Sequence, residues 1–431
     1  MRFKLFTFLL IVLSQNSWAV AKIEHWQTTK GARVYYVNTP ALPMVDVRVV
    51  FDAGSARDEA QFGLAALTSA MLDTGAGEWD ADEIAQRFES VGANFTTGVS
   101  RDMAWLSLRS LVDKTLLDKA LATYEVIVAK PVFNENDFQR EKSRTLAGLK
   151  HREESPGALA NMAFYNALYA NHPYAHPEDG LVQTVAGFEV VDLKRFHQKY
   201  YVASNAIVVI VGDVDKKQAE EISNRLMTGL EVGEKPVEIP EVGVLSAASN
   251  KHIEFPSSQT HVVAGMLGAY RKDPDYFALY VGNHILGGGS LVSKLFDEVR
   301  EKRGLAYSAS SQLQPMMRSG PFVVSLQTRN DQTRKAVEVM NTTLREFVEN
   351  GPTQTELNAA KQNITGGFAM RVDTNAKLTD YVTMIGFYQQ PMDYLEVFQE
   401  KIDAVTVDMV KEVFKRRIHP EWLQTVTVGG N

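Results

Sequence analysis

The sequence predicts an α+β protein with two homologous domains, each a mixed β-sheet covered by helices. Three observations support this fold class. Residues 229–249 contain prolines and glycines that leave neither helical nor strand periodicity, so they form a linker near the middle of the chain. The same order of elements follows on each side of this linker. Strands and helices occur in mixed order within each half, which is typical of α+β layers.

The internal repeat is clearest at the start of each half. Residues 45–51 alternate as a strand before a helix begins, and residues 261–267 do the same after the linker. The residues that follow the two strands correspond one to one: Arg57, Asp58, Phe62 and Leu64 match Lys272, Asp273, Phe277 and Leu279.

Further elements of the first half follow from local patterns. Asp80 and Glu83 form a capping box, and the helix that they open has an apolar face. Residues 104–111 alternate as a strand, and the apolar run 207–211 predicts a fully buried strand.

The second half repeats this plan. Ser290 is expected to cap a helix, and residues 321–328 form a strand. Residues 336–349 and 407–416 have the apolar spacing of long amphipathic helices.

The N-terminus resembles a secretory signal peptide. A basic start is followed by an apolar run at residues 5–13, which is too short to span a bilayer, and cleavage is expected after Ala19 or Ala21. We therefore expect export to a bacterial periplasm without a stable membrane anchor. The expected divisions are a signal peptide at 1–21, an N-terminal domain at 22–228, the linker at 229–249 and a C-terminal domain at 250–431.

Composition excludes several classes of function. The chain has no cysteine, which excludes disulfides, thiolate metal sites and cysteine nucleophiles. Its formal net charge of −7 and the absence of a lysine and arginine cluster argue against nucleic-acid binding. No G-x-S-x-G motif is present, so a serine hydrolase of that type is unsupported.

Residues 63–72, with the sequence GLAALTSAML, resemble the zinc-binding helix of the pitrilysin, insulinase and mitochondrial processing peptidase family. In these inverzincins the motif H-x-x-E-H places two histidine ligands on one helical face beside the glutamate that activates water. The motif falls here on Ala66, Ser69 and Ala70, none of which can bind zinc. The resemblance also places the family's distal glutamate ligand at Ala147, so we expect no metal in this chain.

A longer resemblance lies in the second half. Residues 285–290 (ILGGGS) and 295–308 (LFDEVREKRGLAYS) are similar to the C-terminal domain of the same family. There an arginine and a tyrosine seven residues apart hold the substrate near the scissile bond. The matching residues, Arg300 and Tyr307, are both present, and the resemblance implies that they contact substrate and oxyanion.

Two other motifs have simpler interpretations. His172 and His176 are close in sequence, but prolines at 173 and 177 prevent the helix that would align two imidazole ligands, so a loop is expected. The glycines at 287–289 lack the residues of a phosphate-binding loop, and the family places a glycine-rich hinge there.

The resemblance implies two domains folded as a clamshell around a chamber, and a role beside a partner. The implied function is a non-catalytic subunit of a heteromeric zinc metallopeptidase acting on peptides or unfolded proteins. The partner is a homologous subunit that carries H-x-x-E-H and the zinc. One alternative is a peptide-holding or structural scaffold without a part in hydrolysis, and another is an active peptidase with a cryptic metal site.

Overall fold

The computed structural model describes residues 22–430, and its larger sheet is built from the first half of the chain. This sheet has the strand order β1-β2-β8-β3-β7-β6 and mixed pairing, because β2 and β8 are parallel whereas β3 is antiparallel to β8 and β7. The strands are β1 (Glu24–Gln27), β2 (Arg33–Asn38), β3 (Met44–Phe51), β6 (Asn94–Val99), β7 (Ala104–Leu111) and β8 (Ala206–Gly212), and a separate ribbon pairs β4 (Gly75–Ala76) with β5 (Trp79–Asp80).

The burial of individual residues in these strands agrees with the patterns in the sequence. Every residue of β8 is buried, as its continuous apolar run predicts for a strand covered on both faces. In β7, Ala104, Leu106 and Leu108 are buried and alternate with half-buried residues, so one face meets the core. The predicted strands at 45–51, 104–111 and 207–211 are therefore confirmed. The predicted signal peptide, residues 1–21, lies outside the described residues.

The second sheet repeats this arrangement with five strands in the order β11-β12-β10-β13-β9. Neighbouring strands are antiparallel except for the pair β13 and β9, which is parallel. The predicted strands at 261–267 and 321–328 lie within β10 and β12 and are confirmed. The strands are β9 (Ser249–Glu254), β10 (Gln259–Leu267), β11 (Ala306–Leu313), β12 (Pro321–Arg329) and β13 (Gln424–Gly429).

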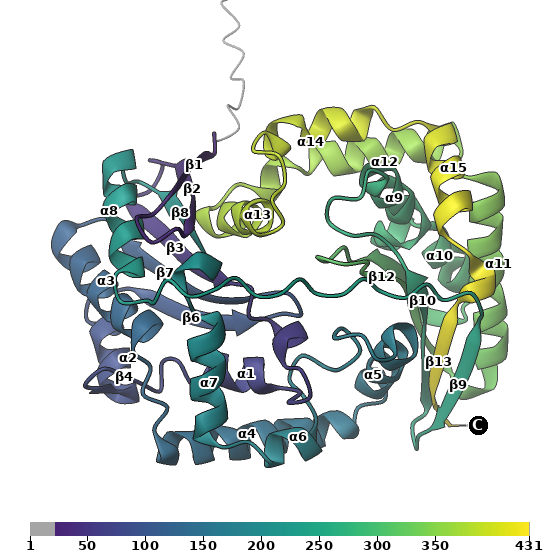
Figure 1. Cartoon of the computed structure of the whole chain (residues 1–431). Helices are drawn as coiled ribbons and strands as arrows, with labels where there is room; N and C mark the ends of the chain where they lie inside the picture. The colour runs from purple at the N-terminus through teal and green to yellow at the C-terminus, as the bar shows by residue number, and fades with distance from the viewer. Residues whose placement is uncertain (1–21, 431) are drawn as a thin grey trace, which may run out of the picture.

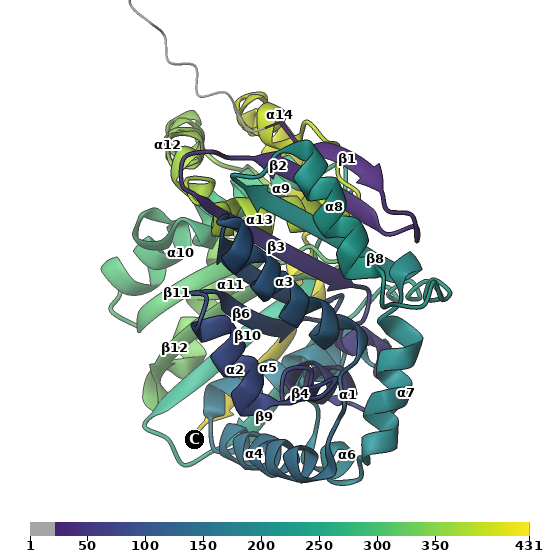
Figure 2. The same ribbon diagram turned by 90° about the vertical axis from the view of Figure 1, so that its left-hand side faces the viewer.

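Helices cover the outer face of each sheet (Figure 1). Figure 2 shows α2 (Ala81–Glu89), α3 (Lys114–Ala129) and α8 (Lys216–Met227) in front of the larger sheet. Within residues 22–430, no helix combines the length and hydrophobicity needed to cross a membrane. The remaining first-half helices are α1 (Leu64–Ala70), α4 (Glu135–Glu153), α5 (Pro156–Tyr169), α6 (Val182–Ala186) and α7 (Val190–Tyr200), and those of the second half are α9 (Tyr276–Asn283), α10 (Lys294–Phe296), α11 (Thr333–Asn350), α12 (Gln354–Gly366), α13 (Asn375–Phe387), α14 (Tyr394–Asp403) and α15 (Val407–Arg417).

Each half also supplies one helix to the sheet of the other half. Helix α5 belongs to the first half in sequence, yet it packs on β10 and β13 of the second sheet. Helix α13 belongs to the second half and packs on β8, β3 and β2 of the first. The two halves are thus interlocked by a reciprocal crossing of helices, which Figure 1 shows near the centre of the molecule.

The segment between the halves is extended and held at several points. Residues 229–248 contain no helix or strand and run from one half to the other (Figure 1). Arg318 Nε donates to the carbonyl oxygen of Ile239 at 2.6 Å. Nε2 of His172 donates to the carbonyl oxygen of Pro240 at 2.9 Å. These bonds fasten the segment along the surface.

Most predicted helix features are present, but one is wrong. The capping box of Asp80 and Glu83 is formed, and α11 and α15 contain the ranges predicted for them. Ser290 does not cap a helix, because its φ of 55° is left-handed and it lies inside a 3₁₀ turn. The N-cap position of α10 is taken by Ser293, whose hydroxyl donates to the carbonyl oxygen of Ser290.

Candidate functional site

Helix α1 is fixed at its N-terminus by a buried carboxylate. Gly63 takes a φ of 97°, which a glycine adopts without strain, and turns the chain into the helix. Asp58 then accepts the N–H groups of Gly63 at 2.7 Å and Ala65 at 2.8 Å. Burial raises the pKa of Asp58 to about 8, whereas these two donors favour its ionised form. The start of α1 is therefore held in one orientation.

Small side chains occupy the positions that correspond to zinc ligands. Ala66 is half-buried and lines a pocket of about 500 Å³, Ser69 is buried and Ala70 is exposed. Ala147 is exposed on α4, which packs against α1. The residues present do not fit a zinc ion, because none of the four offers an imidazole or a carboxylate.

Ion pairs occupy the charged groups around this pocket. Arg101 donates to Glu178 at 2.7 Å, and its guanidinium lies 3.8 Å from the centre of the Tyr165 ring. Arg152 pairs with Asp179. Each carboxylate is thus neutralised by an arginine and is a poor candidate for a metal ligand. Throughout the described part of the chain, no group of three or more histidine, aspartate and glutamate side chains is placed to hold a metal.

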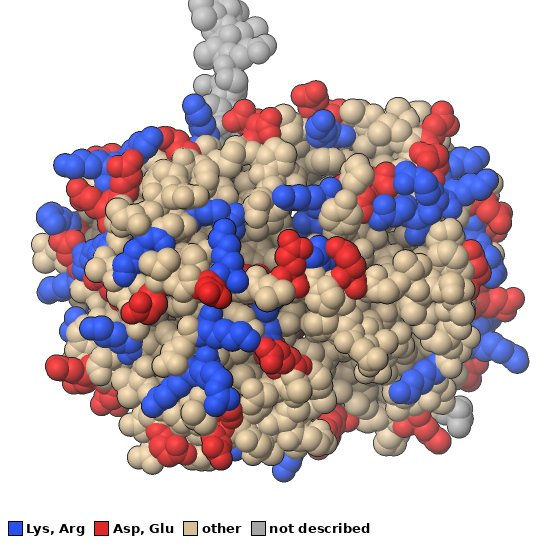
Figure 3. Space-filling view, in the orientation of Figure 1, with Lys and Arg blue, Asp and Glu red and all other residues tan. Residues whose placement is uncertain are grey.

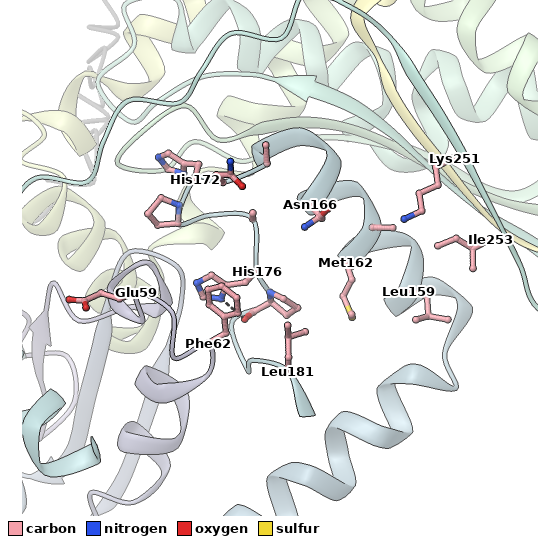
Figure 4. Close-up of a pocket in the computed structure, with 16 residues that line it drawn as sticks. Glu59, Phe62, Leu159, Met162, Asn166, His172, His176, Leu181, Lys251 and Ile253 are labelled. Atoms are coloured by element: carbon pink, nitrogen blue, oxygen red, sulfur yellow. Dashed lines mark hydrogen bonds between the residues drawn. The ribbon is translucent and has the colours of Figure 1, made fainter. Parts of the chain in front are cut away.

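His172 and His176 point in different directions within the loop that follows α5 (Figure 4). His172 contacts the linker, while the ring of His176 stacks on Phe62 with centres 4.3 Å apart. Burial lowers the pKa of both imidazoles. The residues form the loop that the prolines predict, and the two rings have separate structural partners.

Arg300 and Tyr307 are brought together at the edge of the second sheet. The pairing of β11 with β12 shifts between Ala306 and Ser308, so Tyr307 is the extra residue of a β-bulge and turns outward. Tyr307 is 79% exposed, and the guanidinium of Arg300 lies 4.7 Å from the centre of its ring. Arg300 also lies over the ring of Phe296, at 4.8 Å.

The structure does not bring this pair to the pocket beside α1. That pocket is lined by α1, β6, α4, α5 and the loop at 177–179, and neither Arg300 nor Tyr307 contributes to it. The hydroxyl of Tyr307 also makes no hydrogen bond within residues 22–430. Tyr307 therefore faces solvent, and Arg300 is half-buried beside it, so another molecule has access to the tyrosine and to part of the guanidinium.

Asp102 is a buried residue that the sequence patterns did not single out. Its carboxylate accepts the hydroxyls of Tyr174 at 2.5 Å and Tyr388 at 2.8 Å, and the N–H of Met317 at 2.8 Å. Tyr388 and Met317 belong to the second half of the chain, so one carboxylate joins both halves. The only signal in the sequence is a charged residue in the turn between two strands.

A pocket of about 560 Å³ lies between the halves next to Asp102. Arginines from both halves line it together with aromatic rings, and the guanidinium of Arg271 lies 5.0 Å from the ring of Tyr388. On the outer face seen in Figure 3, basic and acidic side chains are interspersed over much of the surface. The chemistry of the pocket suits peptide carbonyls and aromatic side chains.

Known proteins resemble this chain along most of its length. Residues 33–178 match the family described as Insulinase (Peptidase family M16), and residues 188–364 match the family described as Peptidase M16 inactive domain. The crystal structure of a peptidase M16 inactive domain from Pseudomonas fluorescens has a TM-score of 0.92 and 38% identity, covering 95% of this chain and 98% of that one.

Two further relatives carry different descriptions. An uncharacterized zinc protease from Rickettsia bellii is 24% identical over 389 residues, which cover 89% of this chain and 93% of the relative. A non-peptidase homolog from Helicobacter pylori is 26% identical over 390 residues, which cover 89% of this chain and 88% of the relative. The similarity thus extends to proteins described as zinc proteases and to one described as a non-peptidase.

Proposed function

Because this chain belongs to the M16 (insulinase) peptidase family, we propose that it is a substrate-binding subunit of a heteromeric zinc metallopeptidase. In this proposal a homologous partner with an H-x-x-E-H motif holds zinc and activates water. This chain holds the peptide and is inactive alone.

The pocket beside α1 supports the first part of the proposal. Ala66, Ser69, Ala70 and Ala147 have no donor atoms that suit zinc, and the nearby acids are paired with arginines. Four substitutions at positions that correspond to ligands and catalytic base point to an abandoned metal site.

The exposed pair at β11 is the observation that carries the proposal. Arg300 and Tyr307 meet on a bulge, outside the pocket of their own chain. The guanidinium of Arg300 has several N–H donors for a peptide carbonyl, and the hydroxyl of Tyr307 is free to donate to an oxyanion. Their place on the surface suits a site completed by a second subunit.

The arrangement of the halves motivates a wider proposal about the shape of the molecule. We infer that residues 22–228 and 250–431 act as two domains that close like a clamshell around a chamber, of which the pocket between the halves is part.

We also propose that residues 1–21 direct export to the periplasm and are removed. Mass spectrometry of the exported chain should then find an N-terminus at Val20 or Lys22, and an intact Met1 would contradict export with cleavage.

Reconstitution with the partner tests the function. The chain, the H-x-x-E-H subunit encoded or purified with it, and an equimolar mixture are each assayed with the same unfolded protein and peptide substrates. We expect cleavage by the mixture and none by this chain alone. The partner assayed alone should be far slower than the mixture.

A structural scaffold is the second candidate, and the description of the Helicobacter pylori relative favours it. A scaffold would assemble with the partner but leave its turnover independent of Arg300 and Tyr307. If the mixture of the two subunits cleaves no faster than the partner alone, the scaffold role replaces the proposed substrate-binding role.

A further inference from the structure

Strand β9 forms the open edge of the second sheet, opposite to the edge that carries Tyr307. Within the described residues its strand pairing is with β13 alone, and five of its six residues are exposed. An open edge offers unpaired backbone groups to an additional strand. This edge is separate from the surface that the proposed function uses.

The direction of the backbone groups follows from the parallel pairing. On the β13 side, the N–H of Ser249 donates to the carbonyl oxygen of Leu423, and the N–H of Phe255 donates to that of Gly429. Because successive residues of a strand face opposite sides, the N–H and C=O groups of Asn250, His252 and Glu254 point away from β13. They form a ladder that an extended chain can continue.

A pocket lies on one face of this edge. Lys251 and Ile253 project from β9 toward α5, where Leu159, Met162 and Asn166 form the other wall (Figure 4). The pocket measures about 600 Å³ and is largely apolar. It suits an apolar side chain, with room beside Lys251 for a carboxylate.

A second pocket of about 470 Å³ lies on the opposite face. His252 and Asn250 project into it from β9, and Arg334 lines it from α11. No acidic residue contributes to the lining. Arg334 forms no ion pair within residues 22–430, so the charge of this pocket favours an acidic side chain.

We propose that β9 binds an extended peptide by strand addition, with apolar side chains in the pocket beside α5 and acidic side chains in the pocket beside α11. The two pockets alternate along one strand edge with the two-residue period of a peptide strand. Backbone bonds to Asn250, His252 and Glu254 supply affinity, and the pockets select a peptide in which apolar and acidic residues alternate. This site is independent of zinc and of the partner subunit.

Binding of labelled peptides to the full chain tests the proposal by fluorescence anisotropy. The probe is a short peptide in which leucine alternates with glutamate, and lysine replaces glutamate in the matched peptide. We expect the glutamate peptide to bind at least about tenfold more tightly, and N-methylation of the peptide amides that face β9 to abolish binding. Hydrogen exchange should show new protection at Asn250, His252 and Glu254.

Three variants locate the site. His252→Pro removes an outward N–H and leaves the backbone pairing with β13, although the side-chain bond of His252 to Thr427 is also lost, and should abolish binding. Arg334→Glu should weaken the glutamate peptide about tenfold and improve the lysine peptide, whereas Arg345→Glu, the same change elsewhere on α11, should alter neither. Equal binding of both peptides, protection at β6 or β11 in place of β9, or no binding to the unmodified chain would each overturn the proposal.

Discussion

The interior, with the pocket beside α1 and the adjoining pocket between the halves, differs from the surface at the start of β11 in how the fold uses charged and hydroxyl groups. Arginines beside α1 pair with Glu178 and Asp179, and next to the pocket between the halves Asp102 accepts three hydrogen bonds. At β11, Tyr307 is 79% exposed on a bulge, and its hydroxyl makes no hydrogen bond within the described residues. Contacts within the fold thus account for these charged groups of the first region, whereas in the second Arg300 has only a weak ion pair with Glu301, at 3.8 Å, and its contacts with aromatic rings. This difference supports the proposal that Arg300 and Tyr307 contact another molecule.

The largest expected effect in the first region is at Asp102. Asp102→Ala leaves two buried tyrosine hydroxyls and one N–H without their acceptor, so the free energy of unfolding should fall by about 3–5 kcal/mol. Urea unfolding measures this change. Asp331→Ala is the control, because the pair of Asp331 with Arg329 is exposed and should contribute less than about 1 kcal/mol. Equal losses in the two variants would contradict the role of Asp102 in joining the halves.

In the second region the expected loss is in turnover. Changing Arg300 to alanine and Tyr307 to phenylalanine together should reduce peptide cleavage by the reconstituted pair on the order of a hundredfold. Tyr307 is exposed and Arg300 only half-buried, so assembly and the zinc content of the partner should stay unchanged. Tyr270→Phe, which also removes a hydroxyl from the second half, should retain full turnover. Full cleavage by the double variant would favour the scaffold.

Acid should destabilise the buried interior through His197. Burial lowers the pKa of this imidazole on α7 to about 4, whereas in the unfolded chain it is near 6.5. Between these values the unfolded chain binds a proton that the folded chain does not, so stability falls as pH falls from 6.5 to 4, by up to about 3 kcal/mol. His197→Phe should have a flatter dependence of the urea midpoint on pH. An unchanged slope would show that other groups govern acid stability.

One chemical change in both regions gives the finest comparison. Tyr174→Phe removes the hydroxyl bonded to Asp102 and should cost about 1–3 kcal/mol of stability. Tyr307→Phe removes an exposed hydroxyl and should change stability by less than about 0.5 kcal/mol. Thermal or urea unfolding compares the two directly. Similar losses would mean that Tyr307 is also a structural residue.

Much of each sheet was predictable from the sequence, because local patterns determine it. The alternation at 104–111 and the apolar run at 207–211 specify their strands, and α11 follows from helical periodicity. The crossing of α5 and α13 was not predictable, since an apolar helical face shows that it is buried but not against which sheet. The prediction that Ser290 caps a helix was wrong, because Ser290 lies in a left-handed turn and the N-cap position of α10 falls on Ser293.

The candidate site was predictable to a different extent. The substitutions at Ala66 and Ala70 could be read directly from a motif with fixed spacing. Asp102 has no such motif, because its partners Tyr174, Met317 and Tyr388 are distant in sequence and meet only through the interlocked halves.

The zinc content of purified proteins tests the central claim most directly. Elemental analysis should find no stoichiometric zinc in this chain alone and one zinc in the complex with its H-x-x-E-H partner, lost when the partner's motif is changed. One tightly bound zinc in this chain alone, with peptide cleavage that a chelator abolishes, would contradict the claim that Ala66, Ser69, Ala70 and Ala147 mark a lost metal site.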